Sequence, residues 1–142
     1  MKIVHRAGRE SNFVRAVSTL QQCRPANIVR LLGLVKADGS DKIEGMLINY
    51  VEGARGLRDV NVISLDECEK WSSQVIEYLH GKELVWGDAK AANVLVGKDG
   101  NAILIDFGGG YTSGCVDEIN HNSPVGDFQG LESIVLFLEG KI

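Results

Sequence analysis

The amino-acid sequence predicts an α+β fold, because two hydrophobic periods alternate along its 142 residues. Three segments carry apolar residues at the helical period of 3.6, at 11–23, 64–81 and 127–138. The other apolar runs are short, and turn residues separate them in two pairs, which is typical of antiparallel hairpins. A chain of this length is expected to form a single domain, 1–142, with a sizeable core.

The first 53 residues predict one helix and three strands. The helix at 11–23 begins with Ser11 as its capping residue and stops before Arg24-Pro25. The strands are predicted at 1–6, 28–36 and 42–51, and a turn at 37–41 joins the last two into a hairpin.

The remainder of the chain predicts two helices and a second hairpin. Residues 54–62 are polar and are expected to form a loop or a short helix. Ser64 and Glu67 form a capping box for the helix that ends at Gly81. The hairpin has strands at 94–96 and 102–105, and the last helix carries an apolar stripe that includes Phe128.

The composition excludes several classes of function. The net charge is −4, with acids and bases mixed along the chain, so the sequence carries no electrostatic signature of nucleic-acid binding. No apolar run is long enough to span a membrane, and a mean hydropathy near zero with 44% hydrophobic residues is typical of a folded globular protein. Cys23, Cys68 and Cys115 are widely spaced and are predicted to be reduced thiols of a cytoplasmic protein.

The candidate site lies in 84–110. Asp88, Lys90 and Asn93 share one short loop, and Asp106 follows the second hairpin. Because a hairpin brings its two ends together, Asn93 and Asp106 are expected to face the same point, with Asp88 nearby. Hard oxygen ligands of this kind hold Mg²⁺ against phosphates, while a separate carboxylate orients an attacking hydroxyl. The alternative is that these residues are only turn and cap residues.

The pattern Asp88-x-Lys90-x-x-Asn93, followed by Asp106-Phe107-Gly108, resembles the catalytic loop and the Asp-Phe-Gly motif of the eukaryotic protein kinase family. The resemblance implies that Asp88 is the catalytic base and that Lys90 steadies the transferring phosphoryl group. It implies further that Asn93 and Asp106 bind the metal, Mg²⁺, and that the phosphoryl donor is ATP.

The same resemblance extends to the first 53 residues. Lys2 lies where kinases carry the strand lysine that contacts the α- and β-phosphates, although a solvated chain end explains a lysine there equally well. The segment MLINYVEG resembles the last small-lobe strand and the hinge. Ile48 would then border the adenine pocket, and the backbone of Asn49–Val51 would offer hydrogen bonds to the base, so that Asn49 and Val51 are candidate nucleotide contacts. An ordinary buried strand end is the alternative for these positions.

The sequence also departs from the family pattern. Trp86-Gly87 replaces the usual His-Arg, and a glycine there also resembles small-molecule kinases such as aminoglycoside phosphotransferases. Ala16 occupies the position of the helix glutamate that pairs with the strand lysine. The glycine-rich loop, the Ala-Pro-Glu signature and the C-terminal helices of the large lobe are not found. Asp127 resembles the aspartate that anchors the catalytic loop, with a simple N-cap as the alternative.

The resemblance implies a kinase-like α+β fold, with a reduced small lobe (1–53) of antiparallel strands plus one helix and a truncated, mainly helical large lobe (54–142). The implied function is an ATP-dependent phosphotransferase of the protein kinase type, which transfers the γ-phosphate to a hydroxyl of a protein substrate. The alternative is a catalytically impaired pseudokinase that acts as a nucleotide-binding or scaffold module. No nucleic-acid or membrane partner is expected.

Overall fold

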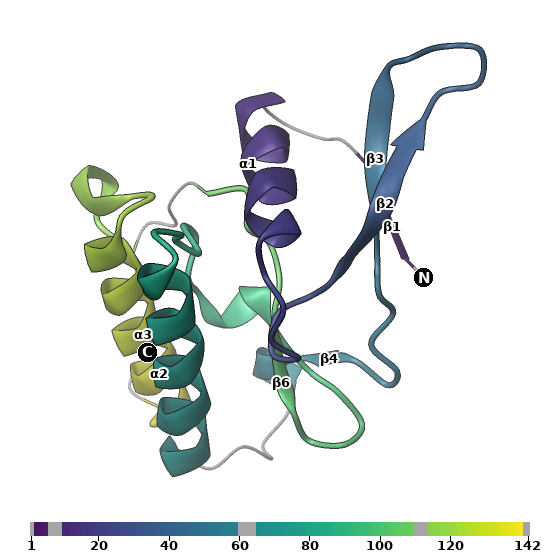
Figure 1. Cartoon of the computed structure of the whole chain (residues 1–142). Helices are drawn as coiled ribbons and strands as arrows, with labels where there is room; N and C mark the ends of the chain where they lie inside the picture. The colour runs from purple at the N-terminus through teal and green to yellow at the C-terminus, as the bar shows by residue number, and fades with distance from the viewer. Residues whose placement is uncertain (1, 6–9, 60–64, 110–113, 141–142) are drawn as a thin grey trace.

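The computed structural model describes residues 2–5, 10–59, 65–109 and 114–140 of the chain. The described residues form two small antiparallel sheets and three α-helices, with α1 between the first sheet and the pair formed by α2 and α3 (Figure 1). The helices are α1 (Glu10–Gln21), α2 (Leu65–Gly81) and α3 (Pro124–Leu138). The strands are β1 (Lys2–His5), β2 (Leu31–Lys36), β3 (Ile43–Ile48), β4 (Arg55–Gly56), β5 (Val94–Val96) and β6 (Ala102–Leu104).

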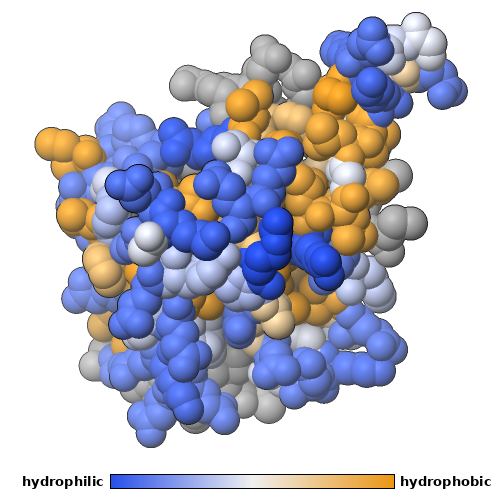
Figure 2. Space-filling model, viewed as in Figure 1, coloured by the Kyte–Doolittle hydropathy of each residue, from blue (hydrophilic) through white to orange (hydrophobic). Residues whose placement is uncertain are grey.

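The first sheet has the order β1-β3-β2, and β3 pairs antiparallel with both neighbours. The helix α1 buries Ala16 and Leu20 on one face, as its apolar stripe predicts. Apolar residues gather over the sheet in Figure 2, and Leu32, Leu34 and Val14 are among the exposed large hydrophobic residues. The predicted cap at Ser11 is wrong, because the helix already begins at Glu10.

The segment between α1 and β2 joins the first sheet to the second, which has the order β4-β5-β6. The Leu104 N–H donates to the Asn27 carbonyl over 2.7 Å, and the Val29 N–H donates to the Leu104 carbonyl over 3.0 Å. The strand predicted from residue 28 therefore begins only at Leu31, because Ile28 forms a parallel bridge with Leu104 instead. Of the loop predicted at 54–62, residues 54–59 hold the two-residue strand β4, which pairs with β5, and a short 3₁₀ turn at Leu57–Asp59. Residues 60–62 lie outside the described residues.

The helices α2 and α3 lie side by side in Figure 1. Ser64, the predicted capping residue of α2, lies outside the described residues. The last helix begins three residues earlier than predicted, at Pro124, because the Ser123 hydroxyl caps it and accepts the Gly126 N–H over 3.1 Å. Phe128 does not belong to the buried stripe: it is 58% exposed, with its ring edge-on to the His80 ring.

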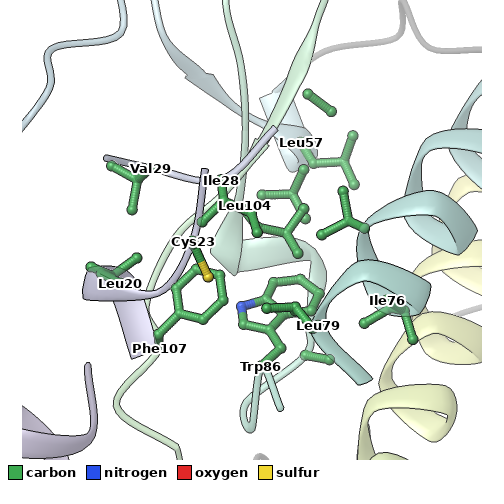
Figure 3. Close-up of a cluster of buried hydrophobic side chains, with 14 of the residues drawn as sticks. Leu20, Cys23, Ile28, Val29, Leu57, Ile76, Leu79, Trp86, Leu104 and Phe107 are labelled. Carbon is green, nitrogen blue, oxygen red and sulfur yellow. The ribbon is translucent and has the colours of Figure 1, made fainter. Parts of the chain in front are cut away.

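The core combines residues of α1, of α2 and of the segments before and after the second hairpin, as Figure 3 shows. Its largest fully buried side chains include Trp86, Phe107, Leu79 and Leu104. The three cysteines are unpaired thiols, and burial raises the pKa of the Cys68 thiol to about 11, so that this thiol stays protonated at neutral pH. The described helices include none that is both long and apolar enough to cross a membrane.

Leu104 offers a direct test of this core. Its side chain is fully buried and its backbone bridges the two sheets, so Leu104→Ala is expected to lower the free energy of unfolding by about 2–5 kcal/mol. The control is Ile119→Ala, which removes a side chain that is 91% exposed and is expected to change stability by less than about 0.5 kcal/mol. Urea unfolding followed by circular dichroism measures both, and equal losses would contradict the assignment of the core.

Candidate active site

The loop between α2 and β5 gathers the three residues that the sequence placed there. The Asn93 Nδ2 donates to the Asp88 carbonyl oxygen over 2.8 Å and lies 3.4 Å from the Asp88 Oδ2. The Lys90 Nζ forms an ion pair with the same Oδ2 at 2.9 Å. Asp88 and Asn93 are both buried, and the 3₁₀ turn Ala91–Asn93 leads directly into β5. The structure therefore brings Asp88, Lys90 and Asn93 into one cluster.

The hairpin of β5 and β6 returns the chain to this cluster, as predicted. Its register pairs Val94 with Leu104, and beyond the hairpin the Ile105 N–H donates to the Asn93 carbonyl over 3.0 Å. Asp106 follows directly, is exposed, and has a φ of 60°, which is uncommon for a residue other than glycine. Phe107 is buried in the core, so the chain turns sharply between these two residues.

Asp127, on α3, holds the backbone of the loop that carries Asp88. Its carboxylate is fully buried and accepts the N–H groups of Trp86 and Gly87, each over 2.9 Å. The His80 Nε2 lies 3.0 Å from the same carboxylate, and because a carboxylate only accepts hydrogen bonds, this nitrogen carries the proton. Ser123 is the N-cap of α3, so the capping alternative for Asp127 is wrong and the anchoring contacts are present.

The structure gives a physical reason for the glycine at position 87, where the family usually has arginine. Gly87 has a φ of 99°, and a Cβ built on it would lie 2.7 Å from the Gly109 Cα and 2.9 Å from the Asn122 Oδ1. A side chain at this position would therefore meet both backbone strain and a steric clash. Close packing of Gly109, in the segment after Asp106, against Gly87 therefore explains why glycine replaces the usual arginine at position 87.

A cavity of about 430 Å³ is lined by Ile105, whose N–H is bonded to Asn93, and by Asp106. It opens between α1, the end of β3 and the segment 105–108, and its lining is mainly apolar. Four of the residues predicted to contact nucleotide or metal line it: Ile48, Asn49, Val51 and Asp106. Its volume lies within the range of small-molecule sites.

Asn49 and Val51 line this cavity, and some of their backbone groups are already bonded to neighbouring residues. The Asn49 N–H donates to the Arg30 carbonyl over 3.0 Å, and the Asn49 side-chain oxygen accepts the Arg30 N–H over 2.6 Å. The Val51 carbonyl accepts the Ala54 N–H. The Asn49 carbonyl and the Val51 N–H have no hydrogen-bond partner within the part of the chain that the structure describes. Lys2 pairs with Ile48 in the sheet, but its side chain lies outside the described part.

The wall formed by α1 carries no carboxylate where the family has its glutamate. Ala16 occupies that place, is 5% exposed and lines the cavity. The backbone of the same helix closely approaches the segment after Asp106, since a Cβ built on Gly108 would lie 3.3 Å from the Asn12 carbonyl oxygen. The helix thus contacts this segment through backbone and apolar groups.

Two contacts of the site were not predicted from the sequence. One is the hydrogen bond from the Trp86 Nε1–H to the Ile105 carbonyl over 2.9 Å, and the other is the contact of His80 with Asp127. The replacement of the usual histidine by Trp86 marked the position, but no spacing pattern indicated the partner of the indole. For His80 the position near the end of α2 suggested only a surface or cap contact.

The known proteins that this chain resembles are protein kinases. The protein kinase domain model matches residues 1–126. A probable serine/threonine-protein kinase of Dictyostelium discoideum is 33% identical over 99 residues, which cover 65% of this chain and 19% of that protein. A probable cyclin-dependent kinase 10 of the same organism is 33% identical over 101 residues, 67% of this chain and 27% of that protein.

A probable L-type lectin-domain containing receptor kinase of Arabidopsis thaliana is 32% identical over 113 residues, which cover 71% of this chain and 16% of that protein. The chain belongs to the protein kinase family, as the motif around Asp88 and Asp106 predicted. The kinase-like α+β fold is confirmed as well. The chain spans less than a third of the length of these relatives.

The anchor at Asp127 can be tested by replacing its carboxylate with an amide. In Asp127→Asn an NH₂ group takes the place of one oxygen and faces a buried N–H donor, so we expect a loss of about 1–3 kcal/mol in the free energy of unfolding. Asp66→Asn is the matched control, because Asp66 also lies in the first turn of a helix but is exposed. Its effect is expected to stay below about 1 kcal/mol. Urea unfolding measures both, and a smaller loss in Asp127→Asn than in the control would refute the anchor.

Proposed function

We propose that this chain binds ATP with Mg²⁺ and transfers the γ-phosphate to a hydroxyl group of a protein substrate. The observation that carries the proposal is the cluster of Asp88, Lys90 and Asn93, which is hydrogen-bonded to Ile105 in the segment that bears Asp106. That segment in turn lines a cavity of about 430 Å³. Phosphoryl transfer depends mainly on positioning and on electrostatic stabilisation, and these residues supply both.

Each residue of the cluster has a distinct task in this proposal. Asp88 accepts the proton of the attacking hydroxyl and orients its oxygen. Lys90, whose ammonium group is 2.9 Å from the Asp88 carboxylate, carries the positive charge that steadies the transferring phosphoryl group. Asp127 keeps the backbone of this loop in place, because its carboxylate holds two successive N–H groups.

The residues present fit a magnesium ion. The amide nitrogen of Asn93 is committed to the Asp88 carbonyl, which leaves the amide oxygen as the ligand atom, and Asp106 supplies a carboxylate. The described residues contain no group of three His, Cys, Asp or Glu side chains able to hold a metal. Two protein ligands suit Mg²⁺, which usually binds proteins through one or two carboxylates and completes its shell with phosphates and water. When bound, it would neutralise phosphate charge.

The cavity fits the adenine of ATP. The Val51 N–H and the Asn49 carbonyl offer one donor and one acceptor, and Ile48 contributes an apolar wall. Lys2 is the proposed contact to the α- and β-phosphates, since its strand runs beside Ile48. A base with a polar edge and apolar faces matches such a lining.

The second candidate function is that of a pseudokinase, which binds nucleotide or a scaffold partner without turnover. The observation that favours it is Ala16, whose methyl group lines the cavity where the family carries a carboxylate. Without that carboxylate the strand lysine loses the partner that holds it over the phosphates. Binding of MgATP would then persist while the transfer step is lost.

Asp88→Ala separates the two candidates. If Asp88 is the catalytic base, the variant should lose at least about a hundredfold in the rate of transfer to a degenerate peptide library of serine, threonine and tyrosine acceptors. Its affinity for MgATP should change less than about twofold, because Asp88 is not a proposed metal ligand. Asp38→Ala, in the exposed turn between β2 and β3, is the control. Transfer by the wild type with equal transfer by Asp88→Ala would remove the proposed role, and binding of MgATP without transfer by the wild type would select the pseudokinase.

Asp106→Asn tests the metal site. A ligand that binds only the folded protein stabilises it by about 2.7 kcal/mol at a hundredfold excess over Kd. Mg²⁺ is therefore expected to raise the melting temperature measured with ATP, and Asp106→Asn should abolish most of the rise, because a carboxylate contributes a full charge. Asn93→Ala should abolish a smaller part, because its amide contributes only a dipole. A melt that responds to ATP identically with and without Mg²⁺ would disprove the site.

A further inference from the structure

We propose that a second cavity, between the end of α1 and the start of β2, binds a phosphate group that belongs to a free phosphate or to a phosphorylated side chain of a peptide. This cavity has a volume of about 300 Å³ and contains none of the candidate site residues. Its two cationic residues are Arg24, which follows α1, and Arg30, which directly precedes β2. Binding here requires neither ATP nor the transfer step, so it goes beyond the proposed function.

The lining of this second cavity favours an anion. Besides the two arginines, it consists of one amide side chain and three apolar residues, which are Gln21, Leu20, Cys23 and Leu31, so no carboxylate of the described residues lines it. Figure 2 shows strongly hydrophilic side chains over the end of α1, next to the apolar surface of the first sheet. The chain as a whole has a net charge of −4, so this positive region is a local feature.

A third cation acts on the same end of α1. Burial raises the pKa of the Cys23 thiol, and the charges of Lys82 and Arg24 act in the opposite direction. The Lys82 ammonium group lies 5.4 Å from the centre of the Tyr78 ring. The Tyr78 hydroxyl accepts the Arg24 N–H over 3.2 Å and donates to the Gln22 carbonyl over 3.2 Å. Tyr78, on α2, therefore holds the backbone that presents Arg24.

The guanidinium of Arg24 is oriented by the carbonyl groups at the end of α1. Its Nη1 donates to the Gln21 and Cys23 carbonyls, each over 3.0 Å, as cations near a helix C-terminus commonly do. This capping uses Nη1 alone, and the Nε and Nη2 groups have no partner within the part of the chain that the structure describes. Nε and Nη2 share the edge of a guanidinium that can bind a phosphate through two parallel hydrogen bonds.

Arg30 is held by its backbone, whereas its side chain is uncommitted. Its N–H donates to the Asn49 Oδ1 over 2.6 Å, and its carbonyl accepts the Asn49 N–H over 3.0 Å. Its guanidinium makes no hydrogen bond or ion pair with the residues that the structure describes. The cavity thus has a second guanidinium on a fixed backbone, with all its donors available to a ligand.

Two guanidinium groups match a phosphate better than a carboxylate. A phosphomonoester carries a charge of about −1.5 to −2 at pH 7 and three acceptor oxygens, so it can pair with both arginines at once. A carboxylate carries a single charge and would leave one arginine without a partner. The volume of about 300 Å³ lies at the lower end of the range of ligand pockets, which suits a group of this size.

The first test uses the whole chain without nucleotide, with inorganic phosphate as the probe. Titration of ¹⁵N-labelled protein, followed by NMR, is expected to give saturable shifts of the amide signals in 20–31. Arg30→Gln should weaken this binding at least about tenfold, because it removes charge-assisted hydrogen bonds to the phosphate. Arg55→Gln is the matched control, since Arg55 is also exposed and donates to a backbone carbonyl, that of Asp59, but lies outside the cavity. It should change the affinity by less than about twofold.

Arg30→Gln is preferred to Arg24→Gln because it removes no contact within the described residues, whereas Arg24 also caps α1. Arg30→Lys keeps the charge but not the planar pair of donors, and should bind phosphate more weakly than the wild type and more tightly than Arg30→Gln. Equal weakening in Arg30→Gln and Arg55→Gln would reduce the effect to net charge and overturn the proposal. Shifts confined to 88–106, which would place the phosphate in the candidate active site, would overturn it as well.

The second test distinguishes the two sources of the phosphate group. A fluorescent phosphoserine peptide of degenerate sequence is compared with its unphosphorylated form by fluorescence polarisation, with inorganic phosphate as the competitor. Binding of the phosphopeptide at least about tenfold tighter than that of inorganic phosphate assigns the site to phosphorylated chains, and equal affinities assign it to a free phosphate. In both cases Arg30→Gln must lose the binding. Because no ATP is present, failure of the proposed function leaves this result unchanged, and absence of binding of either probe by the wild type would refute the site.

Discussion

The buried carboxylate of Asp127 is the constraint on which the rest of the site depends. A carboxylate without exposure to water must be matched by hydrogen-bond donors, or its burial would be strongly unfavourable. Here the donors are the backbone N–H groups of Trp86 and Gly87 and the His80 ring. Because two of the three donors belong to consecutive residues directly before Asp88, satisfying this charge also fixes the backbone that presents the candidate base.

In α3, Gly130 lies about one turn after Asp127, and there the helix backbone contacts the loop that carries Asp88. A Cβ built on Gly130 would collide with Ala89, which is itself fully buried next to Asp88. Asp127 and Gly130 are three residues apart and therefore lie on the same face of α3. The Asp127 carboxylate binds the loop through hydrogen bonds. Gly130 has no side chain, so the loop can lie close to the helix backbone. Glycine is required at position 130 because the two backbones lie close together. At position 87 it is required for the same reason and also because φ is positive.

The sequence predicted features that depend on local spacing. The Asp-Gly turn defined the hairpin of β5 and β6, and the offsets among Asp88, Lys90 and Asn93 indicated their cluster. Contacts set by tertiary packing were not predictable in this way: Ile28 leaves the first sheet for Leu104, and the Trp86 indole finds a carbonyl nineteen residues away. Phe128 fits a helical stripe by its period, but the neighbouring surface of α2 does not cover it.

The two sides of the cavity are built on different physical principles. On the hinge side, Ile48 and Val51 offer apolar surface and backbone polar groups, and Ala16 adds only a methyl group. On the other side, Asp106 supplies a carboxylate, while Asp88 and Lys90 form their ion pair in the loop that leads into β5. Asp106 belongs to both, since it lines the cavity while Ile105 is bonded to Asn93. Asp106, at a positive φ, is therefore the residue through which the apolar cavity is connected to the cluster of Asp88, Lys90 and Asn93.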